Sequence, residues 1–209
     1  MSSQLVLYTN HQHSSPYVLS AYAALVEKNL PFELKEINLT TGEQHSGDFT
    51  RLSLTARVPT LVVGDFSLAE SSAIDEYLED AYPAPGHTAI YPADLQLRAR
   101  ARQIQAWVRS DLGALREERP TSIIYGTKNP NSLSKNAQRA CDKLLAVAGS
   151  LIDKDGNNLF GAWSIADVDL SVMLNRLVAN GDTVPANIRK YTERQSSRPS
   201  IQSWWKLPH

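Results

Sequence analysis

The sequence contains very little cysteine: Cys141 is its single thiol in 209 residues. One cysteine excludes an internal disulfide, a CxxC redox pair and a zinc site built from several thiolates. No apolar run approaches the ~20 residues of a membrane span. No basic residue precedes the short apolar stretch Leu5-Val6-Leu7, so the start of the chain lacks the parts of a secretory signal. We therefore expect a cytoplasmic protein that has no membrane partner.

A large excess of one charge is also absent, because the net charge is −1. The balance differs along the chain: residues 1–80 hold 4 Lys/Arg against 11 Asp/Glu, and residues 81–209 hold 17 against 11. This asymmetry favours two differently built halves. The basic half has no run of basic residues, so we expect no nucleic-acid partner. With 42% apolar residues, the composition is typical of a globular protein with a buried core.

The first eighty residues alternate strand-like and helix-like stretches. Apolar residues recur at every second position in residues 32–37 and at helical spacing in residues 16–28. Gly64-Asp65 supplies the turn of a β-hairpin. The helix after the hairpin is expected to begin at Ser72, with Asp75 completing a capping box. The expected order is β-α-β-α-β-β-α, with strands at 5–8, 32–37, 60–63 and 66–68 and helices at 16–28, 43–53 and 72–82.

The strand pattern ends before residue 83. Residues 83–93 contain three prolines and one glycine without apolar periodicity, which is typical of a linker. Helical spacing follows, and Ser164 and Asp167 form the signature of a capping box. Helices are expected at 93–119, 134–153, from 164 onward, 186–194 and 198–206. The sequence thus predicts an α/β domain over 1–82, a linker over 83–93 and an all-helical domain over 94–209.

Short motifs lie at the ends of these elements. They are Ser14-Ser15-Pro16, Arg57-Val58-Pro59, Glu70-Ser71 and Ser164-Ile165-Ala166-Asp167. In this order and spacing, the whole chain resembles the glutathione S-transferases, and most closely their bacterial, serine-dependent members. The resemblance implies a thioredoxin-like N-terminal domain and a helical domain that contributes the electrophile site. It also implies a homodimer that uses glutathione as co-substrate and needs no metal or prosthetic group.

Ser15 is the candidate catalytic residue. A serine directly before a proline starts a helix well, and the same hydroxyl can donate a hydrogen bond to a thiolate that the helix dipole also favours. Together these effects lower a thiol pKa of ~8.5 by roughly one to three units. Ser14 is the alternative hydroxyl, since a shift of one residue in matching the chain to the family motif exchanges the two serines. Tyr8 is a weaker candidate. The resemblance implies that the serine stabilises the thiolate and does not itself attack.

The resemblance assigns two neighbouring residues to the backbone and glycine end of glutathione. It implies that Pro59 is a cis proline, so that the main chain of Val58 pairs with the cysteinyl residue of the tripeptide. Arg57 then lies near the glycine carboxylate, which suits a guanidinium. From the residues alone, Val58-Pro59 is a loop kink and Arg57 a solvated surface residue.

Three further residues complete the expected glutathione site. Glu70 and Ser71 stand where a strand gives way to a helix, and the resemblance places them at the γ-glutamyl end, where Glu70 meets the ammonium. Helix capping at Ser71 or Ser72 is an equally good interpretation. Gln44 is expected as another contact of the glycine end, with His45 as its competitor.

Other reactive side chains have structural interpretations. His11 and His13 have the spacing of metal ligands, but we expect a polar loop rim and no metal site. Cys141 is expected to be a packed side chain, and Ser164 with Asp167 to serve folding. Candidates for the electrophile pocket are Trp107, Arg109 and Asp111, for which helix surface or packing is the preferred interpretation.

The sequence therefore indicates a glutathione transferase that activates glutathione as a thiolate for attack on electrophiles or organic hydroperoxides, with a role in detoxification or oxidative stress. Two alternatives stay open. One is a glutathione-dependent peroxidase or disulfide reductase with little conjugating activity, and the other is a non-catalytic relative used for protein interaction. Retention of Ser15, Arg57, Glu70 and Ser71 together disfavours the latter, because an interaction scaffold needs none of them.

Overall fold

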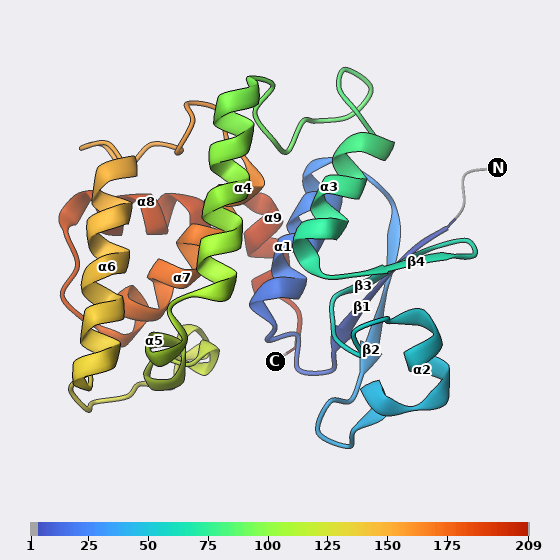
Figure 1. The fold of residues 1–209 in the computed structure, drawn as a ribbon, viewed down its shortest axis with the longest axis horizontal. Helices are drawn as coiled ribbons and strands as arrows, with labels where there is room; N and C mark the ends of the chain where they lie inside the picture. Colours follow the sequence, from blue (N-terminus) through green and yellow to red (C-terminus); the bar gives the residue numbers. More distant parts are fainter. Residues whose placement is uncertain (1–3, 209) are drawn as a thin grey trace. The chain divides into compact units, whose positions relative to one another are not determined.

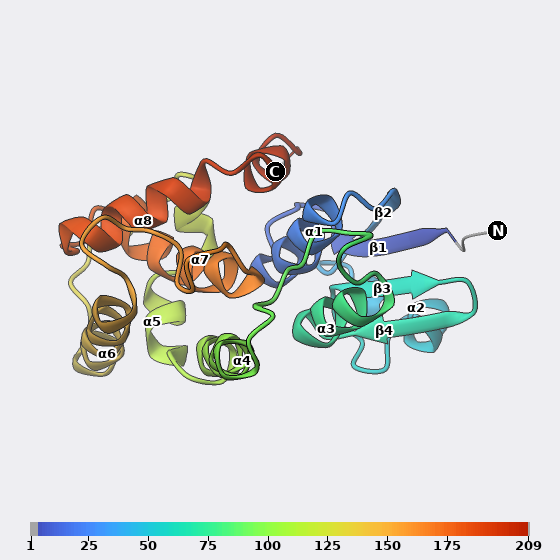
Figure 2. The same ribbon diagram turned by 90° about the horizontal axis from the view of Figure 1, so that it is seen from above.

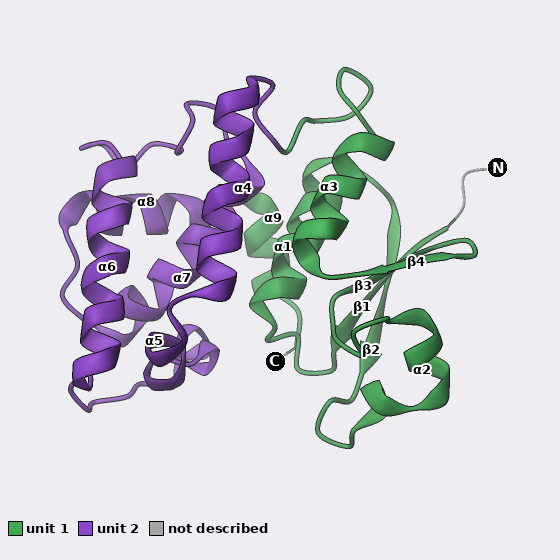
Figure 3. Ribbon diagram, in the orientation of Figure 1, with its two compact units in different colours: residues 1–90, 199–209 green, residues 91–198 purple. Residues whose placement is uncertain are grey.

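The computed structural model describes residues 4–208. These residues form two compact units, one of residues 4–90 and 199–208 and the other of residues 91–198 (Figure 3). The sequence-based boundaries at 82/83 and 93/94 stay a prediction, but residues 199–208 pack in the first unit and not with the helical half. Within residues 4–208, no helix combines the length and the apolar character that crossing a bilayer requires.

The first unit is built on one four-stranded sheet with the order β2-β1-β3-β4 (Figure 1). β1 runs parallel to β2 and antiparallel to β3, and β3 and β4 form the predicted hairpin, with Gly64 in its turn at φ 61°. The four predicted strands are confirmed, and in residues 32–37 the apolar side chains are less exposed than the polar ones between them. Their bounds are β1 Leu5–Asn10, β2 Phe32–Ile37, β3 Thr60–Val63 and β4 Phe66–Ala69.

Helices cover both faces of this sheet. α1 and α3 lie side by side on one face, and α2 lies on the other (Figures 1 and 2). Phe49 of α2 packs edge-on against Tyr8 of β1, with ring centroids 5.5 Å apart. The helices of this unit are α1 Pro16–Glu27, the 3-10 turn η1 Glu43–His45, α2 Gly47–Leu52, α3 Ser71–Ala81 and α9 Pro199–Trp205.

The start of α3 differs from the sequence prediction. The helix begins at Ser71, and Glu70 occupies the N-cap position. Asp75 is fully buried and accepts a hydrogen bond from the Ser20 hydroxyl of α1 at 3.0 Å. The predicted Ser72–Asp75 capping box is therefore wrong, because burial between α1 and α3 gives the carboxylate a tertiary partner that spacing along one helix does not reveal.

The C-terminal segment that contains α9 completes the first unit by packing on α1. Tyr22 lies edge-on to Trp204 with centroids 5.2 Å apart, and its hydroxyl donates to Ser203 Oγ at 3.2 Å. Ser200 donates to the Glu27 carboxylate at 2.6 Å. These contacts give the last helix a specific position on α1.

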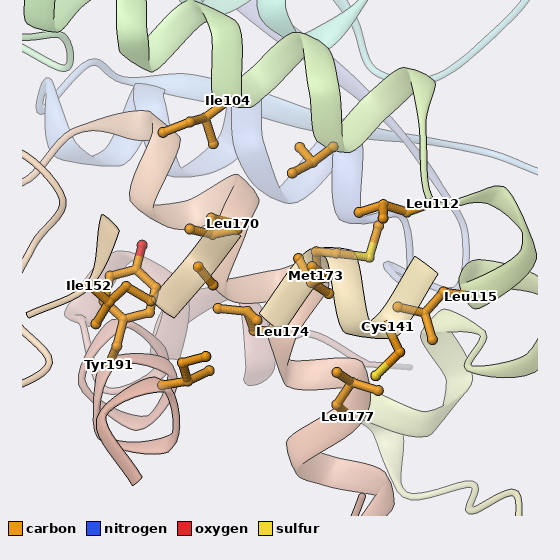
Figure 4. Packing of buried hydrophobic residues seen from close by; sticks show 14 residues of the cluster. Ile104, Leu112, Leu115, Cys141, Ile152, Leu170, Met173, Leu174, Leu177 and Tyr191 are labelled. Carbon is orange, nitrogen blue, oxygen red and sulfur yellow. The ribbon is translucent and has the colours of Figure 1, made fainter. Parts of the chain in front are cut away.

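The second unit is entirely helical in its regular structure. α7 is buried along most of its length, and its neighbours pack apolar residues around it (Figure 4). The predicted capping box is confirmed, since the Ser164 amide donates to Asp167 Oδ2 at 2.9 Å. Its elements are α4 Leu95–Ser110, α5 Gly113–Glu118, η2 Thr121–Tyr125, α6 Lys135–Leu151, α7 Ile165–Asn180 and α8 Ala186–Ser196.

The prediction of a single helix over 93–119 is wrong, because the structure has two helices there. Leu112 adopts a left-handed conformation at φ 64°, and its amide donates to Asp111 Oδ1 at 2.8 Å, so α4 ends and α5 starts anew. Both Leu112 and Leu115 remain buried. The apolar stripe therefore continues across the break, and periodicity alone does not detect it.

Candidate active site

The register of the sheet brings the predicted site residues to one end of it. Asn10, the last residue of β1, pairs with Ile37, the last of β2, while Thr60 at the start of β3 pairs with Ala69 at the end of β4. Tyr8 lies opposite Thr60, so the last residues of β1, β2 and β4 and the first residue of β3 lie at the same end of the sheet. The segments that leave this end carry the residues predicted for glutathione: Ser14, Ser15, Gln44, Arg57, Val58, Glu70 and Ser71.

The loop after β1 holds the two candidate hydroxyls. Ser15 is the N-cap of α1, and its Oγ accepts from the Val18 amide at 3.3 Å, so the capping role expected from Ser15-Pro16 is present. The buried Asn10 accepts from the Ser15 amide at 3.2 Å and donates to Ser14 Oγ at 2.9 Å. Within residues 4–208, no group accepts a hydrogen bond from either hydroxyl. Sequence reasoning missed Asn10, since an asparagine at a strand end has no distinguishing pattern.

The segment before β3 presents a free stretch of main chain. The Val58–Pro59 bond is cis, as expected. The buried Ser53 fixes this loop, because its hydroxyl donates to the Arg57 carbonyl at 3.0 Å and accepts from the Arg57 amide at 3.1 Å. Among the described residues, neither the amide nor the carbonyl of Val58 has a partner, and the exposed Arg57 guanidinium has none either. The groups that the resemblance assigns to glutathione are thus unoccupied by the chain itself.

Glu70 has a strained backbone. It is exposed, it lies at φ 74° and ψ 114°, and its side chain makes no capping bond. A non-glycine residue with positive φ is uncommon, and such strain gathers at functional sites. Ser71 is buried as the first residue of α3. Because Glu70 is the N-cap, neither Ser71 nor Ser72 occupies that position, and the capping interpretation is wrong. The carboxylate of Glu70 has no partner in the described part of the chain.

Gln44 and His45 lie in η1, on the segment that follows β2. The Gln44 carbonyl oxygen Oε1 is buried without a hydrogen-bond partner, whereas His45 is exposed. A buried polar atom without a partner costs free energy. This orphaned oxygen makes Gln44 the stronger of the two as a ligand contact.

The expectation that His13 lines a polar rim is wrong. The residue is 3% exposed, one ring nitrogen lies 2.7 Å from the Pro208 carbonyl, and the other lies 3.4 Å from the Glu36 carboxylate. The ring also packs edge-on against Trp204. His13 is therefore buried under the C-terminal segment. Residues 4–208 contain no group of three or more His, Cys, Asp or Glu side chains arranged to hold a metal ion.

The three electrophile-pocket candidates are engaged within the second unit. Trp107 Nε1 donates to Asp111 Oδ2 at 3.0 Å, and Arg109 forms a two-pronged ion pair with Asp169 at 2.9 and 3.2 Å. Lys143 also pairs with Asp111, and this hydrogen bond, with those of Leu112 and Trp107, lowers the pKa of the Asp111 carboxyl to about 2. These contacts support the structural interpretation of all three.

Cys141 is 4% exposed and lies among Leu115 and Leu177 in the core of the second unit (Figure 4). Burial raises the pKa of its thiol to about 11. A protonated, enclosed thiol is a poor nucleophile. The expectation that Cys141 is a packing residue agrees with this position.

Comparison with known proteins extends these observations to the whole chain. Residues 3–80 match the glutathione S-transferase N-terminal domain, and residues 94–208 match the glutathione S-transferase C-terminal domain. A crystal structure of a glutathione transferase homolog from Burkholderia, with bound glutathione, is 45% identical, covers 97% of each chain and superposes with a TM-score of 0.82.

Curated relatives point the same way. Mouse glutathione S-transferase theta-3 is 41% identical over 191 residues, which is 88% of this chain and 74% of that protein. Matches to some other theta-class proteins are shorter and span 52% of their length. A stringent starvation protein A homolog of Haemophilus ducreyi is 30% identical over 85% of this chain and 81% of its own. By its two matched domains, its fold and these relatives, the chain belongs to the glutathione S-transferase family.

Proposed function

We propose that the protein is a glutathione transferase in which Ser15, with Ser14 as the alternative, holds glutathione as its thiolate. The observation that carries this proposal is the serine loop. Two hydroxyls whose oxygens already accept hydrogen bonds, and whose protons have no acceptor among the described residues, stand at the N-terminus of α1. Only an external acceptor, such as a bound thiolate, completes this arrangement.

The chemistry follows from this position. A hydrogen bond from a hydroxyl to an anion and the positive end of the helix dipole both favour the ionised thiol. A glutathione thiol of pKa ~8.5 is then largely ionised at neutral pH. The released proton goes to solvent, and the sulfur attacks an electrophilic carbon whose leaving group departs with the bonding electrons. Attack on the O–O bond of an organic hydroperoxide is the second reaction that we propose for the same thiolate.

The neighbouring segments offer groups that match the ends of the tripeptide. We assign the Val58 main chain to the cysteinyl residue, Arg57 and Gln44 to the glycine carboxylate, and Glu70 to the γ-glutamyl ammonium. Ser71 and the first amides of α3 suit the γ-glutamyl carboxylate. The unpaired groups of Val58, Arg57 and Glu70 each gain a partner of matching charge or hydrogen-bond type in this assignment. Gln44 meets the carboxylate through its NH2 group, since its Oε1 is an acceptor.

The homodimer, the detoxification role and the lack of a metal or prosthetic group are proposed from the family resemblance. The cytoplasmic location is proposed from the sequence features described above, and glutathione is the proposed co-substrate. Small electrophiles and hydroperoxides are the proposed substrates, and nucleic acid is not a proposed partner.

The second candidate is a non-catalytic member that uses the fold for protein interaction. The observation that favours it is that one relative of the chain is named a stringent starvation protein A homolog and not a transferase. A scaffold does not need a strained, exposed Glu70 or a serine pair with unsatisfied protons, so we rank it below the transferase.

Calorimetric titration with glutathione, followed by the ultraviolet absorbance of the thiolate across pH, separates the candidates. A transferase binds glutathione and shows a thiol pKa well below ~8.5. Ser15→Ala is expected to lower turnover of an aryl halide about 100-fold while changing glutathione affinity less than about threefold. A larger loss in Ser14→Ala than in Ser15→Ala moves the assignment to Ser14. Absence of binding at millimolar glutathione contradicts the proposal.

A further inference from the structure

Asn10 holds both serines of the candidate active site. It ends β1, it is 5% exposed, and its carboxamide makes two hydrogen bonds into the loop before α1. The Ser15 amide donates to its Oδ1 at 3.2 Å, and its Nδ2 donates to Ser14 Oγ at 2.9 Å. One buried side chain thus fixes the main chain of one serine and the hydroxyl of the other.

Chemistry determines the direction of these two bonds. A peptide N–H can only donate, so the carboxamide atom that faces the Ser15 amide is the oxygen. The other arm is then the NH2 group, which also can only donate, and the Ser14 oxygen is its acceptor. The hydroxyl proton of Ser14 takes no part in this bond, and within residues 4–208 no group accepts it.

The same bond strengthens Ser14 as a donor. A hydroxyl whose oxygen accepts a hydrogen bond is polarised and donates its own proton more strongly. The Ser15 hydroxyl is polarised in the same way, because its oxygen accepts a hydrogen bond from the Val18 amide at 3.3 Å. Among the described residues neither proton has an acceptor, so each hydroxyl can donate to an external anion near the N-terminus of α1.

We propose that Asn10 is a positioning residue for the reaction, and that it makes the Ser14 hydroxyl a second hydrogen-bond donor to the glutathione thiolate beside Ser15. This inference rests on the proposed function, since it requires a thiolate at the serine loop. Asn10 does not contact the thiolate and acts through Ser14. It thereby raises the thiolate fraction without adding to the contacts that hold the rest of the tripeptide.

Asn10→Asp tests the polarity directly. The carboxylate has the size of the carboxamide and keeps an acceptor for the Ser15 amide, but it replaces the donor arm with a second acceptor. The Ser14 hydroxyl then turns its proton to the introduced carboxylate and away from the thiolate. We expect about tenfold less thiolate in the glutathione complex at neutral pH and a similar fall in kcat. Because loss of the thiolate also weakens binding at neutral pH, glutathione Kd is compared at a pH below the thiol pKa of the wild-type complex, where it should change less than about threefold.

A double-mutant cycle separates this route from the direct effect of a new negative charge. If Asn10 acts through Ser14, N10D lowers the thiolate fraction in the Ser15→Ala background and has no further effect in the Ser14→Ala background. An equal effect in both backgrounds overturns the proposal. Asn29→Asp is the matched control, because Asn29 is exposed beyond the other end of α1 and is expected to leave the thiolate fraction unchanged.

Two safeguards keep the outcomes distinct. Wild-type protein that binds no glutathione, or does not lower its thiol pKa, overturns the proposed function as a whole. Wild-type protein that lowers the pKa, with additive effects of N10D and Ser14→Ala, overturns only the role of Asn10. If N10D does not fold, Asn10→Ser replaces it: its short hydroxyl loses the donor arm toward Ser14, and a smaller effect that vanishes in the Ser14→Ala background is expected.

Discussion

Lys28 and Glu79 form an ion pair in the interior of the first unit, with Lys28 Nζ 2.7 Å from Glu79 Oε2. The lysine side chain has no exposed surface, and it also donates to the carbonyls of Tyr82 and Thr88 at 3.0 Å each. Glu79 accepts in addition from the Ile90 amide at 3.0 Å. This pair therefore fastens the irregular chain after α3 to the end of α1.

Lys28→Met is expected to destabilise the protein strongly. It leaves the Glu79 carboxylate buried without its cation, and breaking a buried pair on one side costs about 3–5 kcal/mol. Urea unfolding of Lys28→Met, Glu79→Leu and the double variant Lys28→Met/Glu79→Leu measures this. The double variant should lose less than the single one, because no buried charge remains. A double variant as unstable as the sum of both single variants contradicts this account.

Glu70 is expected to lower the stability of the fold through its strained backbone and to strengthen glutathione binding through its charge. Glu70→Gly relieves the strain of φ 74° and should raise the free energy of unfolding by about 1 kcal/mol after the entropy of the glycine is counted. Glu70→Gln keeps the strain and should leave stability within about 0.5 kcal/mol. Both remove the charge proposed to meet the ammonium, so glutathione Kd should rise about tenfold in each. Unchanged affinity in both variants removes Glu70 from the proposed site.

Cys141 is expected to react slowly while the protein is folded. With its thiol pKa raised to about 11 by burial, the thiolate fraction at pH 8 is about 100-fold below that of a thiol with a pKa of 9. Alkylation followed by mass spectrometry, with and without urea, should show this difference. Because the folded pKa is the higher one, the stabilisation from the neutral thiol is complete below pH 9 and is lost as the pH rises toward 11. Cys141→Ala should remove that loss and keep transferase activity.

Asp167 is expected to act on folding alone. Its carboxylate accepts from the Leu159 amide at 2.9 Å, the Ser164 amide at 2.9 Å and the Tyr191 hydroxyl at 3.0 Å, and burial raises its pKa in spite of these bonds. Asp167→Ala leaves these buried donors without an acceptor and should cost about 3 kcal/mol. Thermal unfolding should show a lower Tm, and Asp167→Asn, which keeps one oxygen, should lose less. A loss of specific activity in the folded fraction at unchanged Tm contradicts the structural role.

Local chemistry made much of this fold and site predictable. The Ser15 cap, the Gly64 turn and the Ser164–Asp167 box each depend on residues a few positions apart, and such patterns are visible in the sequence. The buried His13 depends on Pro208, Glu36 and Trp204, which the fold brings from other segments, so spacing along the chain did not reveal it. Asn10 and Ser53 bond to residues only four or five positions away, but an asparagine at a strand end and a serine in a loop have no distinguishing pattern. The break at Leu112 was missed because the buried stripe passes through it without a change of period.

The place of α9 has a consequence for the order of folding during synthesis. Trp204, Ser203 and Ser200 complete the surface of α1, so the unit that begins near the start of the chain is finished only when residues 199–208 have left the ribosome. Until then, Tyr22 and its neighbours on α1 lack their covering residues. A nascent chain that stops before Pro199 thus presents an open aromatic surface, which is what a chaperone or a protease recognises in an unfinished protein.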